Sequence, residues 1–378
     1  MELAGASAAK SHNARISGLA TIMRLLDRYI ARRVFRGYAL IMVILASAFS
    51  LIALVRELDS VGKGTYETSD AVLYVLLTLP GWMVELSPAM ALLGALVGLG
   101  ELAAGEELTV MQALGVSRSR IAWSVLKTGL LVMLAVMGLQ EFVAPKLNQL
   151  AFERRTQAVS GMESTSTRRG FWSRNGQRVV HVRRLLHGRI PSEIEIYQFD
   201  DNGWLRFVAW AKEAVIIQDS KRWVLHDVRQ QIIAENKTFT EHFAQLPWDS
   251  PFTPDQITQI LLPVEMLSPS ALYGYVQYLK RAGLAAERPE LTLWQSISRP
   301  LSTMAMVILA IPYVLGPIRQ VSAGKRMVYG GLIGATFHAG SQLTMQLGSL
   351  VHLPAPLATL SPVAVMLGIA VWLYRRRL

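Results

Sequence analysis

The 378-residue chain contains no cysteine and few charged residues, and both scarcities limit what it can be. Without cysteine it forms no disulfides, has no thiolate metal site and carries no cysteine nucleophile. Charged residues make up only 17% of the chain, whereas hydrophobic residues make up 52% and the mean hydropathy is +0.31. This composition is too apolar for an ordinary soluble protein and indicates a membrane protein.

Motifs for nucleotide hydrolysis and metal binding are also missing. The closest match to a phosphate-binding loop is Ala323-Gly-Lys-Arg326, which lacks both the required Ser or Thr and the upstream glycine. No HExxH pattern occurs, and the histidines of the central segment have no ligand-like spacing (His181, His187, His226 and His242). We therefore expect a chain that is not itself an enzyme and that binds no metal or cofactor.

Long apolar stretches, in contrast, are abundant. A helix needs about 20 apolar residues to cross a bilayer core of roughly 30 Å. Stretches of this kind occupy residues 37–55, 71–100, 121–144 and 300–318, and a further apolar segment at 327–374 has room for two helices hinged at Pro354 and Pro356. The sequence therefore predicts six transmembrane helices.

Basic residues indicate how the chain is threaded through the membrane. The net charge is +11, and outside the polar segment after the third span the basic residues gather before span 1, around Arg118, and on both sides of the last two spans. With six spans all these clusters fall on one side, which the positive-inside rule makes cytoplasmic. We expect cytoplasmic N- and C-termini and an outward-facing insertion, so a nucleic-acid partner is not needed to explain the charge.

Four regions follow from this pattern. Residues 1–24 are expected to be a disordered N-terminal extension, and residues 25–145 to contain an interfacial helix, spans 1 to 3 and a short cytoplasmic helix at about 104–115. Residues 146–268 form the outward domain, and residues 269–378 contain spans 4 to 6.

The outward domain has the two-residue periodicity of β-strands. Alternating or β-branched runs occupy residues 178–182, 193–197, 204–217, 223–233 and 237–243, with tight turns between them. Short spacing of this kind is typical of antiparallel β-sandwiches. Five tryptophans are expected to fill the core between sheets (Trp172, Trp204, Trp210, Trp223 and Trp248), although an open sandwich could use the same face to hold an acyl chain.

The loop between spans 2 and 3 has the features of a short helix. Glu106 and Glu107 complement the positive N-terminal dipole, Gly115 suits the position after the C-cap, and Ser117 is available to cap the next helix. Apolar residues on this helix form a surface that a cytoplasmic partner can bind. The alternative is an interfacial helix resting on lipid headgroups, against which the acidic start argues mildly.

Four segments resemble the lipopolysaccharide export permeases of ABC transporters, most closely their G-type branch. They are Leu26-Asp-Arg-Tyr-Ile30, Pro88-Ala-Met-Ala-Leu-Leu-Gly94, Glu107-Leu-Thr-Val-Met-Gln-Ala-Leu-Gly115 and Gly316-Pro-Ile-Arg319. The resemblance implies an α-helical membrane protein with six transmembrane helices and an inserted all-β jellyroll in the periplasm. It also implies that the short helix couples the permease to an ATPase.

The resemblance further implies a function, a location and partners. Such a permease lies in the bacterial inner membrane, extracts lipopolysaccharide from the outer leaflet and passes it to a periplasmic bridge. It pairs with an F-type sibling permease above a homodimeric cytoplasmic ATPase, which binds the ATP and Mg. A single-pass C-type subunit with a periplasmic jellyroll contacts span 1.

Candidate site residues fall into three groups. ATPase coupling is assigned to the short helix and its flanks, where the family's acidic coupling residue is Glu107 (Glu106, Glu107, Met111, Leu114, Gly115 and Arg118). Lipid phosphate is assigned to basic residues at the outer interface, each of which could instead be a snorkelling interfacial base (Arg56, Lys63, Lys146, Arg154 and Arg155). Helix packing is assigned to small residues spaced four apart, which would equally suit a sliding interface with the sibling permease (Gly94, Gly98, Gly330 and Gly334).

Two rival functions remain open from the residues themselves. Glu85 and His338 lie inside predicted spans and could form the proton relay of a secondary transporter. A permease of the same broad type could also carry lipoprotein or another envelope lipid, because an apolar binding wall does not specify its lipid.

Overall fold

The computed structural model describes residues 2–160, 166–167, 171–175, 177–186, 190–216, 222–233, 237–249, 263–281, 283–315, 323–351 and 353–377. His187 and the Gly316-Pro-Ile-Arg319 segment lie outside these residues. The chain divides into two compact units, one made of residues 1–50, 81–139 and 294–378 and the other of residues 51–80 and 140–293. Several long helices contribute to both units, so each unit is treated by itself.

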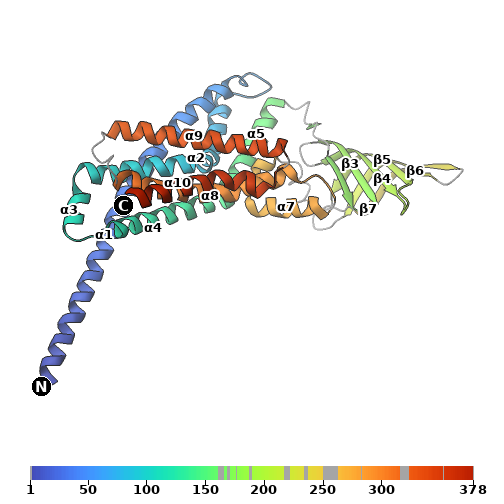
Figure 1. Cartoon of the computed structure of the whole chain (residues 1–378). Coiled ribbons are helices and arrows are strands. Elements are labelled where there is room, and N and C mark those ends of the chain that lie inside the picture. The colour runs from blue at the N-terminus through green and yellow to red at the C-terminus, as the bar shows by residue number, and fades with distance from the viewer. Residues whose placement is uncertain are drawn as a thin grey trace. The chain divides into compact units, whose positions relative to one another are not determined.

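The first unit is entirely helical in its described part. Its helices, drawn in Figure 1, are α1 (Glu2–Leu58), α2 (Thr68–Ala104), α3 (Glu107–Ala113), α4 (Arg118–Gly138), α8 (Glu287–Leu315), α9 (Ala323–Leu350) and α10 (Ala355–Arg377). Of the two prolines predicted as the hinge, Pro354 directly precedes α10, whereas Pro356 lies inside its first turn. α1 begins at Glu2, within the segment 1–24 that is expected to be disordered.

Five of the described helical segments are long and apolar enough to cross a membrane. They are Leu25–Leu58, Thr68–Ala104, Arg118–Val159, Glu287–Val314 and Ala355–Arg376. α9 occupies the position of the predicted fifth span and has 28 residues, but it is less apolar than these five. Multiple apolar helices are therefore confirmed, and the count of six spans stays a prediction.

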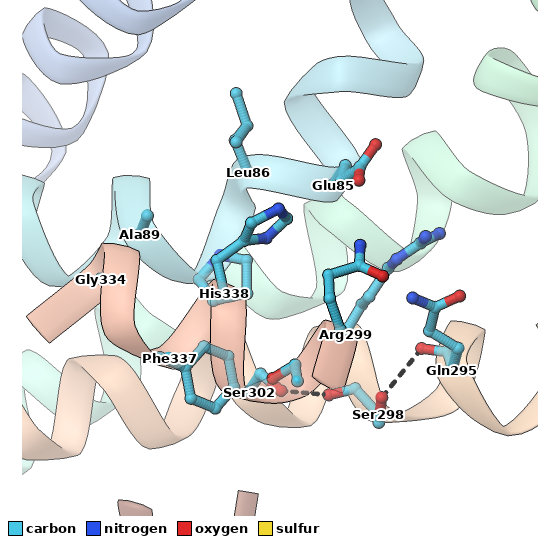
Figure 2. Close-up of a pocket in the computed structure, with 13 residues that line it drawn as sticks. Glu85, Leu86, Ala89, Gln295, Ser298, Arg299, Ser302, Gly334, Phe337 and His338 are labelled. Atoms are coloured by element: carbon cyan, nitrogen blue, oxygen red, sulfur yellow. Dashed lines mark hydrogen bonds between the residues drawn. The ribbon is translucent and has the colours of Figure 1, made fainter. Parts of the chain in front are cut away.

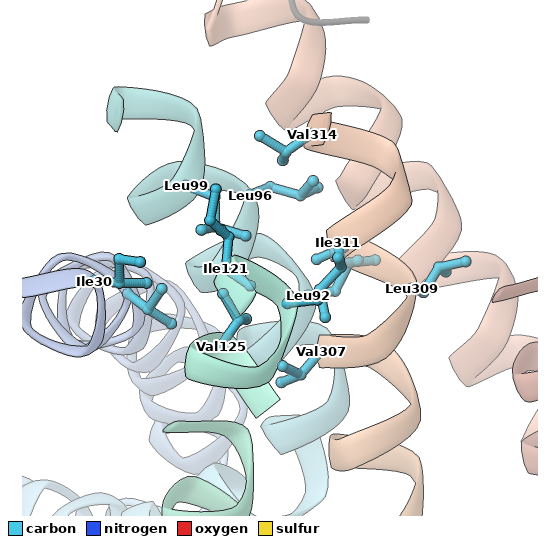
Figure 3. Close-up of a cluster of buried hydrophobic side chains, with 14 of the residues drawn as sticks. Ile30, Leu92, Leu96, Leu99, Ile121, Val125, Val307, Leu309, Ile311 and Val314 are labelled. Carbon is cyan, nitrogen blue, oxygen red and sulfur yellow. The ribbon is translucent and has the colours of Figure 1, made fainter. Parts of the chain in front are cut away.

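Large aliphatic side chains from several helices form the core of the helical unit. Leu92, Leu96 and Leu99 of α2 meet Ile121 and Val125 of α4, as Figure 3 shows, and all five are at most 2% exposed. The cluster is completed by residues of α1 and α8 (Ile30, Val307 and Ile311). A hydrogen bond of 2.9 Å between the Ser87 and Thr303 hydroxyls also links α2 to α8. Packing and polar contacts of this kind are what hold helices together in lipid.

Small residues bring α1 and α2 into backbone contact. A Cβ added to Gly94 would lie 2.5 Å from the Tyr38 Cα, and one added to Gly98 would lie 2.6 Å from the Arg33 carbonyl oxygen. From the other side, a Cβ on Gly37 would lie 2.3 Å from the Gly94 carbonyl oxygen. Since real Cβ atoms do not approach backbone this closely, only glycine permits this helix pair.

α9 packs on α2 at the other two predicted glycines. A Cβ on Gly330 would lie 2.5 Å from a methyl carbon of Leu96, and one on Gly334 would lie 3.3 Å from the Ala89 Cβ. All four glycines predicted to pack helices thus lie at contacts within this chain.

The second unit contains a β-sheet and the short helices around it. A π-helical turn at Leu139–Val143 joins α4 to α5 (Ala144–Ser160), and a 3-10 turn at Val264–Met266 precedes α7 (Pro269–Arg281). The strands are β1 (Ser166–Thr167), β2 (Phe171–Asn175), β3 (Arg178–Leu186), β4 (Ile190–Phe199), β5 (Leu205–Ile216), β6 (Arg222–Ile233) and β7 (Thr238–Asp249).

These strands form one antiparallel sheet. β3 to β7 neighbour each other in chain order, and β1 and β2 both pair with β3. Every strand predicted from the sequence is present, whereas β1 and β2 are too short or too polar to be recognised from their periodicity. The antiparallel prediction is confirmed for the described strands, and closure into a jellyroll stays a prediction.

One face of the sheet carries its apolar core. The core includes Val182, Ile194, Ala211 and Leu225, and Tyr278 of α7 packs against it. The expectation that five tryptophans fill the core is wrong for three of them, because Trp172, Trp204 and Trp210 are 56%, 72% and 40% exposed. Trp210 alternates with buried Ala209 and Ala211 and so faces away from the core.

Trp223 and Trp248 follow the prediction. Trp223 is fully buried and meets Trp248 with 5.5 Å between ring centroids. Their pairing on β6 and β7 anchors the apolar face at one end of these strands.

Candidate functional site

The short helix that the sequence predicts between spans 2 and 3 is present as α3. It spans Glu107–Ala113, which is shorter than the predicted 104–115, because Glu106 adopts a left-handed conformation with φ 56° and ends the preceding turn. Leu108 is buried in the core of the helical unit, and Met111 packs against that core. α3 is therefore fixed to the helices rather than suspended in a free loop.

Gly115 closes α3 as the sequence predicts. Its φ is +90°, and its N–H bonds to the Gln112 carbonyl while the Val116 N–H bonds to the Met111 carbonyl. These two bonds define a Schellman motif, for which a residue without Cβ is preferred. Ser117 then caps α4 by accepting a 3.3 Å hydrogen bond from the Arg120 N–H.

Glu107 is held by the first helix. The Tyr29 hydroxyl donates a 2.7 Å hydrogen bond to its carboxylate, and the Arg33 guanidinium lies 3.6 Å from its other oxygen. Arg33 also donates to the Tyr29 hydroxyl and lies 3.6 Å from Glu101. Charge and hydrogen bonding thus tie the start of α3 to α1.

A second set of polar contacts ties α1 to α4. Asp27 of α1 accepts hydrogen bonds from Arg120 at 3.1 Å, from Lys127 at 2.9 Å and from the Ser124 hydroxyl. Asp27 and Tyr29 both belong to the Leu26–Ile30 segment that resembles the permease family. α1 is consequently bonded to the helices on both sides of the α3 loop.

The outer face of α3 remains accessible. Val110 and Leu114 are 56% and 80% exposed and lie four residues apart, so they share one side of the helix. Glu106, Gly115 and Arg118 are exposed beside them. An apolar pair rimmed by charge on a rigidly mounted helix is suited to a groove on another protein.

The predicted lipid-phosphate residues differ in their partners. Arg56, Lys63, Lys146 and Arg154 are exposed and have no ion pair among the described residues. Arg155, in contrast, is half-buried: its guanidinium pairs with Glu57, donates to the Ser60 hydroxyl at 3.0 Å and lies over the Tyr74 ring at 5.7 Å. Arg155 therefore has its charge compensated within the chain.

A polar cavity lies inside the helical unit. Its volume is about 60 Å³, and Glu85 of α2, Arg299 of α8 and His338 of α9 line it. Figure 2 shows these side chains. Ser298 and Ser302 direct their hydroxyls to main-chain carbonyls on α8 and contribute polar lining. The structure thus brings together Glu85 and His338, the two residues of the proposed proton relay, and adds Arg299 to them.

Several of these contacts could not be recognised from the sequence alone. Tyr29, Arg33 and Asp27 have the spacing of an interfacial helix, and nothing local shows that their partners lie about 80 to 100 positions away. Arg299 directly precedes a predicted span, and no sequence motif marks it as part of a polar cavity. Among the described residues, no three His, Asp or Glu side chains come together as a metal site.

Comparison with known proteins gives a consistent result over almost the whole chain. A family model described as lipopolysaccharide export system permease LptF/LptG matches residues 28–376. Lipopolysaccharide export system permease protein LptG of Escherichia coli (strain K12) is 35% identical over 354 residues, which cover 93% of this chain and 98% of that protein. The protein of the same name from Haemophilus influenzae is 33% identical over 356 residues, which cover 94% and 99%.

Proposed function

We propose, because this chain belongs to the LptF/LptG family of lipopolysaccharide export permeases, that it is the membrane-spanning subunit of an ATP-driven exporter. It would extract lipopolysaccharide from the outer leaflet of the bacterial inner membrane and pass it to a periplasmic bridge. In this proposal α9 is the fifth of six spans, both termini are cytoplasmic and the sheet is part of a periplasmic jellyroll.

The proposed assembly contains subunits that the chain itself does not supply. An F-type sibling permease lies beside it, a homodimeric ATPase binds ATP and Mg below it, and a single-pass C-type subunit with its own jellyroll contacts α1. The chain in this assembly is non-catalytic and binds no cofactor. The similarity of nearly the whole chain to LptG proteins supports lipopolysaccharide over lipoprotein or another lipid as the cargo.

The mounting of α3 is the observation that carries the proposal. Val110 and Leu114 face outward, whereas Leu108 faces the core and Glu107 is bonded to Tyr29 and Arg33. A displacement of α3 by a partner therefore reaches α1 directly. A subunit that works by mechanical transmission needs such a part, because force has to be received on one side and delivered on the other.

Glu107 has two roles in this proposal. One oxygen accepts the Tyr29 hydroxyl, and the carboxylate is still partly exposed beside Glu106, so a basic group of the ATPase can approach it. Arg33 would then share the carboxylate with the partner's cation. This shared contact would join the ATPase to α1 through a single side chain.

Reversal of the Glu107 charge tests the proposal. Glu107→Lys should reduce ATP-dependent transfer of lipopolysaccharide from proteoliposomes by more than about tenfold, since breaking a charge pair at an interface costs roughly 2 to 5 kcal/mol. The assay needs the complete complex with sibling permease and ATPase. Extraction of lipopolysaccharide by this chain alone, without nucleotide, would contradict the proposal.

The polar cavity gives the rival transporter a structural basis, and the same assay separates the two. A proton carrier requires Glu85 or His338 to exchange protons, so Glu85→Gln should abolish transport and Glu107→Lys should be tolerated. An ATP-driven permease predicts the reverse. Arg299 favours the permease, because its guanidinium lines the same cavity and brings a positive charge that acts on the Glu85 carboxylate.

A further inference from the structure

The face of the sheet opposite the core carries a continuous row of polar and aromatic side chains. Cross-strand register places His181 of β3 opposite Glu195 of β4, Glu195 opposite Trp210 of β5, and Trp210 opposite Arg229 of β6. Residues opposite each other on neighbouring strands lie close enough for their side chains to interact. The row therefore crosses the sheet at right angles to its strands.

Glu195 is the fixed centre of this row. Its side chain is only 7% exposed, and it is contacted by His181 Nδ1 at 3.0 Å, by the Tyr197 hydroxyl at 2.9 Å and by Arg183 at 2.6 Å. The Trp172 ring stacks on His181 with 3.9 Å between centroids. Burial raises the pKa of Glu195, but the hydrogen bonds and the Arg183 charge outweigh it and leave the pKa below its usual value.

A groove of about 620 Å³ opens along this row. Its walls include Arg183, Glu195, Trp210, Lys212 and Arg229. Trp210 is 40% exposed, so part of its indole face is available in the groove. The volume falls within the roughly 300 to 1,000 Å³ of sites that hold small molecules.

Strained backbone is concentrated at the same place. Among the described residues, three non-glycine residues have positive φ, and two of them, Glu193 at 52° and Asp227 at 54°, line the groove. Each sits in a strand, where a left-handed conformation breaks the two-residue alternation. Strain of this kind costs of order 1 to 3 kcal/mol and is concentrated at binding sites.

The charges of the groove are partly paired and partly available. Glu195 is paired with Arg183, and Asp227 with His242 at 2.6 Å. The charges of Lys212 and Arg229 act on Asp227, but neither side chain forms a close ion pair among the described residues. The groove therefore presents cationic donors and carboxylate acceptors side by side around one exposed indole ring.

We propose that this groove is a saccharide-binding site in which a sugar ring stacks on Trp210 and its hydroxyls bond to the surrounding charged side chains. A sugar has an apolar C–H face and a rim of hydroxyls that both donate and accept hydrogen bonds. An indole face beside paired donors and acceptors matches both features. Lys212 and Arg229 add a preference for a saccharide bearing phosphate or carboxylate.

The choice of probes rests on the proposed function, which puts the sheet in the periplasm. Two saccharide sources exist there: the sugar part of lipopolysaccharide and the cell-wall polymer. The probes are deacylated lipopolysaccharide, which lacks the acyl tails, and a soluble disaccharide fragment of the cell wall. Binding of either probe to the purified full-length chain in nanodiscs is followed by saturation-transfer NMR and by titration calorimetry.

Trp210→Ala should weaken binding by at least about tenfold, which corresponds to about 1.4 kcal/mol. Trp204→Ala is the matched control, because Trp204 is 72% exposed in the turn that precedes β5 and does not line the groove, and it should leave binding unchanged. Arg229→Gln gives a second test that keeps the indole in place. It should weaken binding of deacylated lipopolysaccharide, which carries phosphate, more than binding of the disaccharide.

The outcomes distinguish this inference from the proposed function. The proposed saccharide site is refuted if neither probe binds the wild-type chain, or if Trp204→Ala and Trp210→Ala lower the affinity equally. This holds whatever the transport assay shows. If the reconstituted complex transfers no lipopolysaccharide with ATP while a probe still binds in a Trp210-dependent way, the proposed function fails and the site stands.

Discussion

At the scale of single residues, the value of a charged side chain depends on partners that lie far away in the sequence. The sequence assigns Arg155 to lipid phosphate, and in the structure its guanidinium pairs with Glu57. Glu195 has no distinguishing local pattern, yet three side chains bond to it on the polar face of the sheet. The sequence shows which residues carry charge, but it does not show which of them pair with one another.

Replacement of Glu195 tests how much that pairing contributes. Its lowered pKa means that the stabilisation is complete above the pKa of the unfolded chain and is lost as the pH falls through the folded value. Glu195→Gln should therefore lower the free energy of unfolding by about 2 kcal/mol at pH 7, and the difference from wild type should shrink below about pH 4. Denaturant unfolding followed by tryptophan fluorescence measures both.

Glu241→Gln is the matched control for this prediction. Glu241 is an exposed carboxylate on β7, so its replacement should leave the unfolding curve unchanged at both pH values. A Glu195→Gln effect that is the same at pH 7 and pH 3.5 would show that the carboxylate charge is not what stabilises the sheet.

At the scale of elements, short-range signals were the most reliable. The Gly115 stop and the Ser117 cap follow from local backbone chemistry, and both were predicted correctly. The strands β3 to β7 were found from alternation alone. The prediction for three of the tryptophans is wrong because alternation defines two faces of a strand without showing which face is buried. The predicted start of α3 is wrong because a glutamate in the left-handed conformation, here Glu106, has no sequence signature.

The Schellman motif at Gly115 predicts a local effect on coupling. Gly115→Ala introduces a Cβ at φ +90°, which costs roughly 1 to 2 kcal/mol and should unwind the last turn of α3. ATP-dependent transport by the complex should fall several-fold while the amount of folded subunit stays the same. Gly115→Asn should retain more activity, since asparagine tolerates this conformation better.

Gly340→Ala provides the comparison for Gly115→Ala. A Cβ at Gly340 meets nothing within 4 Å, and its backbone is helical, so the substitution should be neutral. Equal activity of Gly115→Ala and wild type would mean that the end of α3 does not need a fixed shape for coupling.

At the scale of the whole molecule, the sequence established the class and the resemblance established the family. Apolar runs and basic clusters predicted a multi-pass membrane protein, and five helices of sufficient length and apolarity support it. α9 falls short because His338, Ser341 and Gln342 lower its hydropathy, and the same residues line the polar cavity. In α9, therefore, polar residues that line a cavity lower the hydropathy by which a transmembrane span is recognised.

The close helix contacts at glycine predict that substitution there has a large effect on the stability of the helical unit. Gly98→Leu would force a side chain into the Arg33 and Val34 backbone and should destabilise the helical unit by about 3 kcal/mol or more. Gly331→Leu is the control, because a Cβ at Gly331 meets nothing within 4 Å. Thermal unfolding of the purified chain in detergent compares the two, and equal midpoints would refute close packing of α1 on α2.

The backbone contact at Gly37, Gly94 and Gly98 also restricts how α1 and α2 can move. α1 and α2 have to travel as a single rigid body, since parting them would leave two bare glycine surfaces with nothing to fill the gap. In the proposed function a lipid therefore enters elsewhere than between α1 and α2. Leu40 and Val43 of α1 are 51% and 59% exposed, and aliphatic side chains of this kind would tolerate acyl tails along such a path.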